Sequence, residues 1–332
     1  MYEKLKDNIY KIEVPLPNNP LKATNSYFIK GKDRNLLIDT GMNRKECLDA
    51  LNKAIHSLKV DPKSIDVFVT HLHADHIGLA YHFAKDDSRI FFNYPDSEIV
   101  SDHTYWKRAL KRALENGFPE KEIEEAITKH PGNKYSPEKS DGFTFVKEDQ
   151  IIEVGNYKLK CIETPGHTPG NTCLYEPNEQ IFFSGDHVLW DITPNISGFL
   201  EKLNNPLKKY LESLNKIKEL EVSLVLPGHR STFENLELRV EQLKDHHYKR
   251  IDEIRSILKK SEHQTPYQIA SKMTWDLDCK SWKEFPLMQK WFATGEALAH
   301  LDYMHEEGIL KKEKIPEEKH SNESVFKNYY SL

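Results

Sequence analysis

The sequence predicts an α/β protein with a mainly helical C-terminal part, and three observations lead to this prediction. Short runs of strand-forming residues alternate with polar connections over the first ~230 residues, where a few segments have helical spacing. From Glu234 onward the pattern is mainly helical. Histidine and aspartate residues recur just after the predicted strands, where functional residues gather on a rigid scaffold. We expect a larger domain at residues 1–245 and a smaller one at 246–332, which suits a chain of 332 residues.

The predicted strands are short runs of aliphatic and aromatic residues bounded by polar connections. Residues 25–30 (NSYFIK) and 35–41 (NLLIDTG) form two adjacent strands joined by a turn around Gly31. Residues 47–58 follow them with apolar positions at helical spacing, which predicts a helix. The other predicted strands are 65–70, 89–93, 157–164, 172–176, 181–186 and 222–229.

Residues 96–130 interrupt this alternation with a helical pattern between two predicted strands. The pattern breaks at Gly117 and at Pro119, and a proline fits the first position of a helix because no N–H donor is needed there. We therefore predict an inserted pair of helices, in which Trp106 and Phe118 are core residues.

The C-terminal part begins with one long amphipathic pattern, LELRVEQLKDHHYKRIDEIRSILKK, at residues 236–260. A second helix is predicted at 265–273, where Thr265 is the N-cap and Pro266 lies in the first turn. A third helix at 293–308 ends at Gly308, and a short strand follows it. Helices followed by a polar hairpin indicate a winged-helix-like module, which we predict for residues 246–332.

The overall composition disfavours several classes of partner. The formal net charge of −5 does not indicate a positively charged surface that would bind nucleic acid or an anionic membrane. The N-terminus lacks the apolar stretch of a signal peptide, and no apolar run approaches the ~20 residues of a membrane-spanning helix. The four cysteines are scattered and form no CxxC pair, so we expect reduced thiols in a cytoplasmic protein.

The stretch VTHLHADHIGLA, residues 69–80, places three histidines and an aspartate within six residues after a hydrophobic run. Protonated histidines repel one another, whereas a metal ion takes neutral imidazole and ionised carboxylate as ligands. A polar loop of surface histidines is the alternative, but the same residue types recur in order after later strands and favour ligation. The candidate ligands are His71, His73, Asp75, His76, His167, Asp186 and His229. Zinc takes about four to five ligands, so seven fit two ions that share a bridge.

Other histidines lack this support. His187 stands beside Asp186, and we interpret it as a structural residue or as a neighbour of the ligands. His103, His246 and His247 occur in no motif, and we expect them on the surface or between domains.

The motifs HLHADH, GHTPG, GD and PGH, preceded by IDTG, resemble those of the metallo-β-lactamase superfamily and occur in the same order. The resemblance covers residues ~8–230 and implies that residues 1–245 form the catalytic domain. It also implies a four-layer αβ/βα sandwich with the metals at one edge of two packed sheets. In this family an insertion at the position of residues 96–130 often covers the metal site, so these helices are also candidates for a lid over that site.

The resemblance implies a role for each candidate ligand. The residues that would bind the first metal are His71, His73 and His167. Those that would bind the second metal are Asp75, His76 and His229. Asp186 would bridge the two ions, and Asp39 would orient the histidine loop through hydrogen bonds. Asp75 is also the predicted catalytic residue, because it would hydrogen-bond a bridging hydroxide and relay a proton.

Two bound cations lower the pKa of water to near ~7, so the resemblance implies a hydrolase that uses a metal-bridging hydroxide at neutral pH. We expect two divalent ions as cofactors. Zinc is the default for histidine and aspartate ligands, while iron and manganese fit the same shell.

Several members of the superfamily have features that this chain lacks, and they are therefore disfavoured. Asp186 stands where the commonest secreted zinc β-lactamases carry a cysteine, which disfavours antibiotic hydrolysis. No flavodoxin-like segment is found, and the 43 residues from Asp186 to His229 do not fit the inserted second domain of RNA-processing members. Glyoxalase II is similar in its ligand set, but its glutathione-binding continuation is not found after His229. Lactonases share all seven ligands in shorter chains, and persulfide dioxygenases share similar ligands with one iron.

The C-terminal part supports the main alternative, a nuclease. It resembles the module of the β-lactamase-like-protein-2 type, for which single-stranded RNA cleavage is known. Residues 246–332 contain 14 Lys/Arg and 14 Asp/Glu, whereas a nucleic-acid-binding module normally has a basic face. The neutral alternative is that the module packs on the sandwich, shapes the pocket or forms a homodimer contact.

We therefore expect an enzyme acting on an acyl thioester or ester of a small molecule. A phosphodiesterase or endoribonuclease is the alternative, and a lactonase or persulfide dioxygenase ranks lower. An intact ligand set argues against a non-catalytic binding protein.

Overall fold

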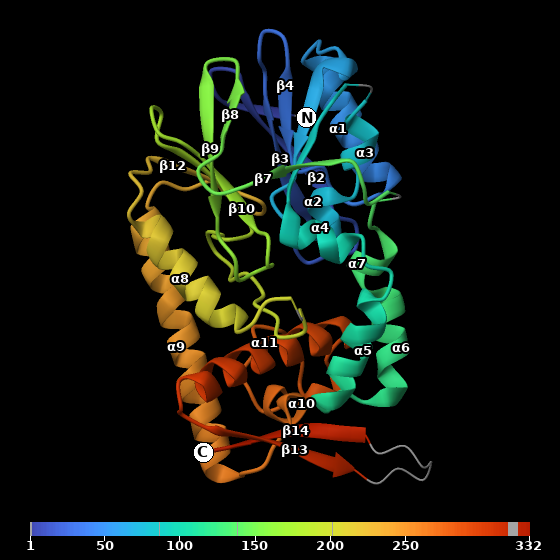
Figure 1. Ribbon diagram of the computed structural model, residues 1–332, viewed down its shortest axis with the longest axis vertical. Coiled ribbons are helices and arrows are strands. Elements are labelled where there is room, and N and C mark those ends of the chain that lie inside the picture. The colour runs from blue at the N-terminus through green and yellow to red at the C-terminus, as the bar shows by residue number, and fades with distance from the viewer. Residues whose placement is uncertain (1, 86, 138, 201, 318–324) are drawn as a thin grey trace.

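The computed structural model describes residues 2–85, 87–137, 139–200, 202–317 and 325–332, and its N-terminal part contains two mixed sheets (Figure 1). The larger sheet has the strand order β1-β2-β3-β4-β5-β6-β7. Neighbouring strands are antiparallel from β1 to β4 and parallel from β4 to β7. The strands are β1 (Tyr2–Lys6), β2 (Ile9–Pro15), β3 (Ala23–Ile29), β4 (Asn35–Ile38), β5 (Ile65–Phe68), β6 (Ile90–Asn93) and β7 (Phe143–Val146).

The smaller sheet has five strands in the order β12-β11-β10-β9-β8. Strand β12 runs parallel to β11, and the other neighbours are antiparallel. These strands are β8 (Ile151–Val154), β9 (Tyr157–Glu163), β10 (Thr172–Glu176), β11 (Ile181–Gly185) and β12 (Leu224–Pro227).

Three apolar cores separate four layers of secondary structure. One lies between the larger sheet and its helices and contains Val67 of β5 and Leu51 of α1. The second lies between the two sheets and contains Phe68 of β5 and Leu174 of β10. The third joins the smaller sheet to α8 and to α9 (Leu236–Lys260). The predicted αβ/βα sandwich is thus confirmed. The helices of this part, with one 3-10 turn at Pro62–Ser64, are α1 (Lys45–Ser57), α2 (Ala74–Ile77), α3 (Ala80–Phe83) and α8 (Pro206–Lys218).

The insertion between β6 and β7 contains four helices, where the sequence predicted two. Pro119 has an extended backbone (φ −65°, ψ 127°) and is the N-cap of α6, so this helix begins one residue later than predicted. Phe118 is fully buried, in agreement with its predicted core position, and Trp106 packs against the same core. The four helices are α4 (Tyr94–Val100), α5 (Tyr105–Glu115), α6 (Glu120–Lys129) and α7 (Pro131–Lys134).

The C-terminal part consists of helices and a hairpin in the predicted order. Helix α9 covers the whole amphipathic pattern, and Thr265 caps α10 through a capping box with Gln268. Helix α11 begins earlier than predicted and ends at Glu306, two residues before Gly308. Its elements, with a 3-10 turn at Trp282–Glu284, are α9 (Leu236–Lys260), α10 (Pro266–Ala270), α11 (Leu287–Glu306), β13 (Lys311–Glu317) and β14 (Val325–Ser331).

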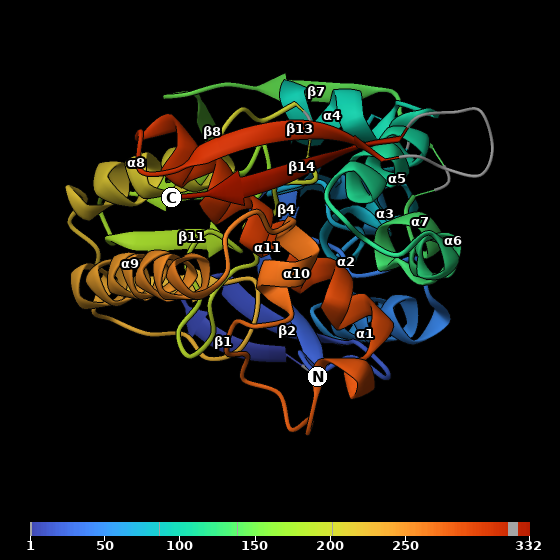
Figure 2. The same ribbon diagram turned by 90° about the horizontal axis from the view of Figure 1, so that it is seen from below.

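Helix α11 lies across one end of the sandwich, as the views from the front and from below both show (Figures 1 and 2). It shares a core with the inserted helices: Phe118 and Ala113 cluster with Trp291 and with Ile254 of α9. The predicted domain boundary at residue 245 lies inside α9, which continues through it. The inserted helices and the C-terminal helices therefore form one packed body at this end.

The four cysteines are free thiols, three of them buried. Among the helices that the structure describes, none is long and apolar enough to cross a membrane.

Candidate metal centre

The seven predicted ligands meet in space because each follows the end of a strand. They are His71 and His73 after β5, Asp75 and His76 on α2, His167 between β9 and β10, Asp186 after β11, and His229 after β12. Their ligand atoms form three overlapping groups, and the atoms within each group lie within 4.8 Å of one another. The tertiary structure therefore gathers residues that are up to about half the chain apart in sequence.

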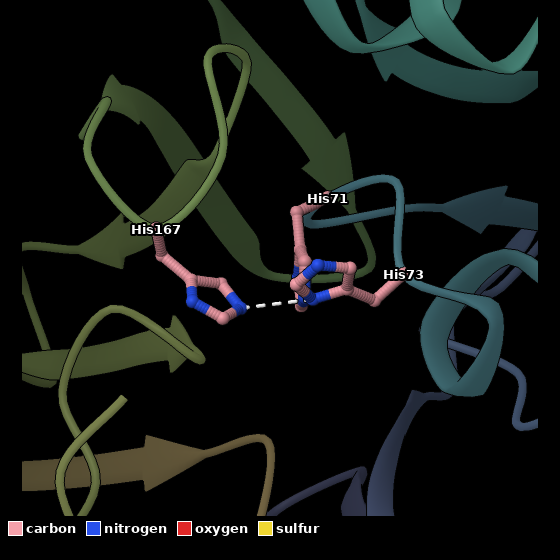
Figure 3. Close-up of side chains that lie close together, drawn as sticks. All are labelled: His71, His73 and His167. Carbon is pink, nitrogen blue, oxygen red and sulfur yellow. Dashed lines mark hydrogen bonds between the residues drawn. The ribbon is translucent and has the colours of Figure 1, made fainter. Parts of the chain in front are cut away.

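The first group consists of three imidazoles that face one another (Figure 3). His73 Nδ1 lies 3.0 Å from His71 Nε2 and 2.9 Å from His167 Nε2. Burial lowers the pKa of His73 to about 3 and also lowers the pKa values of His71 and His167. Three neutral imidazoles with converging nitrogens form the donor set that a divalent cation takes.

Asp186 lies between this group and a second one, which consists of Asp75, His76 and His229. Its Oδ2 is 4.0 Å from His71 Nε2 and 3.3 Å from His229 Nε2, while its Oδ1 is 3.5 Å from His76 Nε2. Asp75 completes the second group, because its Oδ2 lies 3.3 Å from His229 Nε2. One carboxylate thus faces both sets of imidazoles, which is the arrangement of a bridging ligand.

Three buried atoms at the centre have no hydrogen-bond partner among the described residues: Nε2 of His76, Nε2 of His229 and Oδ1 of Asp186. Burial alone lowers the pKa of His229, but the carboxylates of Asp186 and Asp75 outweigh it and raise this pKa to about 10. Burial raises the pKa of Asp186, yet the two histidines hold it well below its usual range. Nitrogens and oxygens that converge without bonding one another need a further partner, and their chemistry fits divalent metal ions.

Hydrogen bonds on the far side of the rings fix which nitrogen faces the centre. Nδ1 of four histidines contacts an oxygen of the chain, so Nε2 of each ring points inward. The pairs are His71 with Thr70 Oγ1 (3.0 Å), His76 with Asp39 Oδ2 (2.7 Å), His167 with the Asn195 carbonyl (2.9 Å) and His229 with the Ala23 carbonyl (2.8 Å).

Asp39 lies outside the three ligand groups and contacts His76. Its side chain is buried, and its carboxylate accepts hydrogen bonds from the Thr70 N–H (2.9 Å) and hydroxyl (2.8 Å). The same carboxylate holds His76 at Nδ1. The backbone of Asp39 has a positive φ of 58°, which is strained for a residue other than glycine. It therefore fixes both ends of the loop that carries the first four candidate ligands.

Asp96 was missed by the sequence reasoning. It lies on α4, is fully buried and accepts hydrogen bonds from Leu72 N–H (2.8 Å), the Thr168 hydroxyl (2.7 Å) and Gly170 N–H (2.6 Å). It thereby ties the loop after β5 to the loop that carries His167. No spacing or motif marks Asp96 in the sequence, so only the fold reveals this role.

The remaining histidines of the part of the chain that the structure describes lie outside the three ligand groups. His187 is buried, its ring packs 5.1 Å from that of Tyr210, and neither ring nitrogen has a hydrogen-bond partner among the described residues. His103 is exposed. His247 is buried between α9 and α11, where it contacts His300 at 3.1 Å.

The sandwich and the converging imidazoles and carboxylates define a metal-dependent hydrolase with a site for a pair of ions. The chain belongs to the metallo-beta-lactamase superfamily, whose family model matches residues 19–229.

Several known proteins are similar to this chain. The beta-lactamase-like protein 2 homolog of Caenorhabditis elegans is 27% identical over 279 residues, which are 82% of this chain and 78% of that protein. The atrochrysone carboxyl ACP thioesterase of Aspergillus fumigatus is 27% identical over 224 residues, 67% of this chain and 55% of that protein. The acyl-coenzyme A thioesterase of Gallus gallus is 26% identical over 221 residues, 63% of this chain and 73% of that protein.

The fold is shared along the whole chain. The crystal structure of a metallo-beta-lactamase family protein from Thermus thermophilus matches with a TM-score of 0.81 and 23% identity, over 99% of both chains. The C-terminal helices are therefore part of the shared architecture.

Proposed function

We propose that this protein hydrolyses an acyl thioester of a small molecule with two divalent metal ions, zinc by default. The convergence of seven histidine and aspartate side chains carries the proposal, because three of their buried atoms have no hydrogen-bond partner among the described residues. Two of the similar proteins are named as thioesterases, which supports an acyl thioester as the substrate class.

The assignment of ligands follows the two groups. The residues that would hold the first ion are His71, His73 and His167. Those that would hold the second are Asp75, His76 and His229, with Asp186 shared between the ions. When bound, the ions would supply a water molecule activated at neutral pH and would polarise the oxygen of the scissile group.

The side chains define the direction from which a substrate approaches. His73 and Asp75 are half-buried, while the other five candidate ligands are buried. Solvent therefore reaches the centre at these two residues and at Asp186, whose side chain is 11% exposed against 14% for Asp75. Asp75 Oδ2 lies 3.3 Å from His229 Nε2 and 3.5 Å from the Thr24 hydroxyl. Burial raises the pKa of Asp75, but His76 and His229 outweigh it and hold this pKa well below its usual range. This ionised carboxylate would accept a hydrogen bond from the activated water and so orient it.

A rate comparison tests this proposal. Metal-loaded protein would be offered an acyl thioester and an activated phosphodiester side by side, with Asp75→Ala as the background and His103→Ala as a control for an exposed histidine outside the centre. We expect faster thioester cleavage that is lost in Asp75→Ala and kept in His103→Ala. Faster phosphodiester cleavage would contradict the proposal and favour the nuclease alternative.

The bridging role of Asp186 has a separate test. Asp186→Ala removes the carboxylate that faces both groups, so we expect loss of metal, of activity and of some stability. A variant that kept two metals per chain would contradict the bridging role.

A further inference from the structure

Helix α11 packs closely against the loop that follows β11, residues 186–200. The N–H of Gly198 donates a hydrogen bond to the Gly295 carbonyl at 2.8 Å. A Cβ added to Gly198 would lie 2.6 Å from Leu298 Cγ and 2.9 Å from Ala299 N, so only glycine permits this approach. The position of this loop is therefore set by the helix.

The same loop carries Asn195, which has partners on both sides. Its backbone carbonyl accepts a hydrogen bond from His167 Nδ1 at 2.9 Å. Its side-chain Nδ2 donates to Glu296 Oε2 at 3.2 Å and to the Phe292 carbonyl at 3.3 Å, and both acceptors lie on α11. A single residue thus joins the candidate ligand His167 to the C-terminal helices.

Glu296 is a buried carboxylate whose two oxygens face different elements. Oε2 faces Asn195, while Oε1 lies 3.9 Å from Arg250 Nε and 3.9 Å from His246 Nε2 on α9. Burial raises the pKa of Glu296, but His246, His300 and Arg250 outweigh it and lower this pKa to about 2. A buried charge is costly, and an apolar residue would fill the same space without that cost. The contact with Asn195 gives this carboxylate a role that an apolar residue would not serve.

We propose that Asn195 and Glu296 are positioning residues, through which the C-terminal helices hold His167 in its metal-binding orientation. This inference rests on the proposed role of His167 as a ligand. His167 depends on this support because its Nδ1 acceptor is a carbonyl in a long connection between β11 and α8, unlike the buried Asp39 that holds His76. The C-terminal part would then contribute to the metal centre itself.

An exchange of the two side chains tests the proposal. Asn195→Asp would place two carboxylates against each other. Asn195→Asp combined with Glu296→Gln would restore one donor and one acceptor between these two residues with their roles exchanged, although the bond to the Phe292 carbonyl stays lost. Changes in groups that orient metal ligands cost about 10–100-fold in metal affinity. We therefore expect a loss of about tenfold in the single variant and recovery of part of it in the double variant. Zinc affinity would be measured by competition with a chromophoric chelator, alongside the thermal unfolding of the metal-free protein.

A matched pair on the same helix provides the control. Glu306 is the last residue of α11, ten residues after Glu296, and its Oε2 accepts a hydrogen bond from Asn205 Nδ2 at 2.7 Å. Asn205→Asp, alone and with Glu306→Gln, makes the same chemical change without touching His167. We expect these variants to alter at most the unfolding temperature and to leave zinc affinity unchanged.

The outcomes separate this inference from the proposed function. If Asn195→Asp does not fold, Asn195→Ala removes the anchor without adding a charge and takes its place. Zinc affinity within twofold of wild type, or a double variant as weak as the single one, would overturn the inference even in an active thioesterase. The expected affinities in a protein that cleaves no thioester would contradict the proposed function alone.

Discussion

Gly228 stands between the last residue of β12 and the candidate ligand His229, and the space beside it is filled. A Cβ added there would lie 2.8 Å from His76 Cε1 and would overlap Oδ1 of Asp186. Ordinary contact begins at 3.4 Å, so Gly228→Ala would displace the His76 ring by about 0.6 Å and the Asp186 carboxylate by more. Displacements near 1 Å cost on the order of 100-fold at a catalytic site, so we expect kcat/KM to fall by roughly 100-fold, about 2.7 kcal/mol.

The assay combines thioester kinetics with the metal content of the purified protein. Gly132→Ala is the control, because a Cβ added there meets its nearest atom at 3.2 Å, outside the centre. We expect this control to keep its metal and its rate. A Gly228→Ala protein that kept both ions and the wild-type kcat/KM would refute the argument that the ligands are packed against this glycine.

Three further predictions concern the groups around and away from the centre. Asp39→Ala removes the acceptor for His76 Nδ1, so zinc affinity should fall by about 10–100-fold in a competition assay; an unchanged affinity would contradict its orienting role. Asp66 is buried, which raises its pKa, but Arg34 and Arg89 outweigh burial and lower this pKa. The ionised Asp66 therefore stabilises the folded state above the unfolded pKa near 3.8, and this contribution is lost as the pH falls below that value. Asp66→Asn should therefore cost about 2 kcal/mol of unfolding free energy at pH 7, and this difference should shrink as the pH falls below about 4; a constant difference would argue against the ion pairs. Removal of metal by a chelator should lower Tm by about 5 °C or more, reversed by added zinc, and an unchanged Tm would indicate that no metal is bound to the folded state.

The candidate ligands could be proposed from the sequence because their signal is local. His71, His73, Asp75 and His76 lie within six residues, and the other three follow hydrophobic strands beside a glycine. Strand ends at one edge of a sheet bring such residues together once the fold is known. The αβ/βα sandwich was accessible for the same reason, since the motifs resemble a family with that fold.

The outer contacts had no such signal. Asn195 and Glu296 are 101 residues apart and occur in no motif, and Asp96 lies in an ordinary helix start. Their roles arise only when the loop after β11, α4 and α11 pack against the ligand loops. A long-range contact between single polar residues leaves no periodic pattern in one sequence.

Some elements were also missed. Strand β1 is mostly exposed and rich in charged residues, which weakens the pattern of a strand. The predicted segments also lack a counterpart for four other elements, which are strands β2, β7 and β8 and helix α8. The winged-helix class of the C-terminal part, the zinc preference, a homodimer contact and the cytoplasmic location stay predictions.

The most direct test of the central claim is a crystal of the zinc-loaded protein with anomalous scattering recorded at the zinc edge. We predict two peaks per chain, one among His71, His73 and His167 and the other among Asp75, His76 and His229, with Asp186 beside both. The absence of ordered zinc at these side chains, or zinc bound only elsewhere on the chain, would contradict the account.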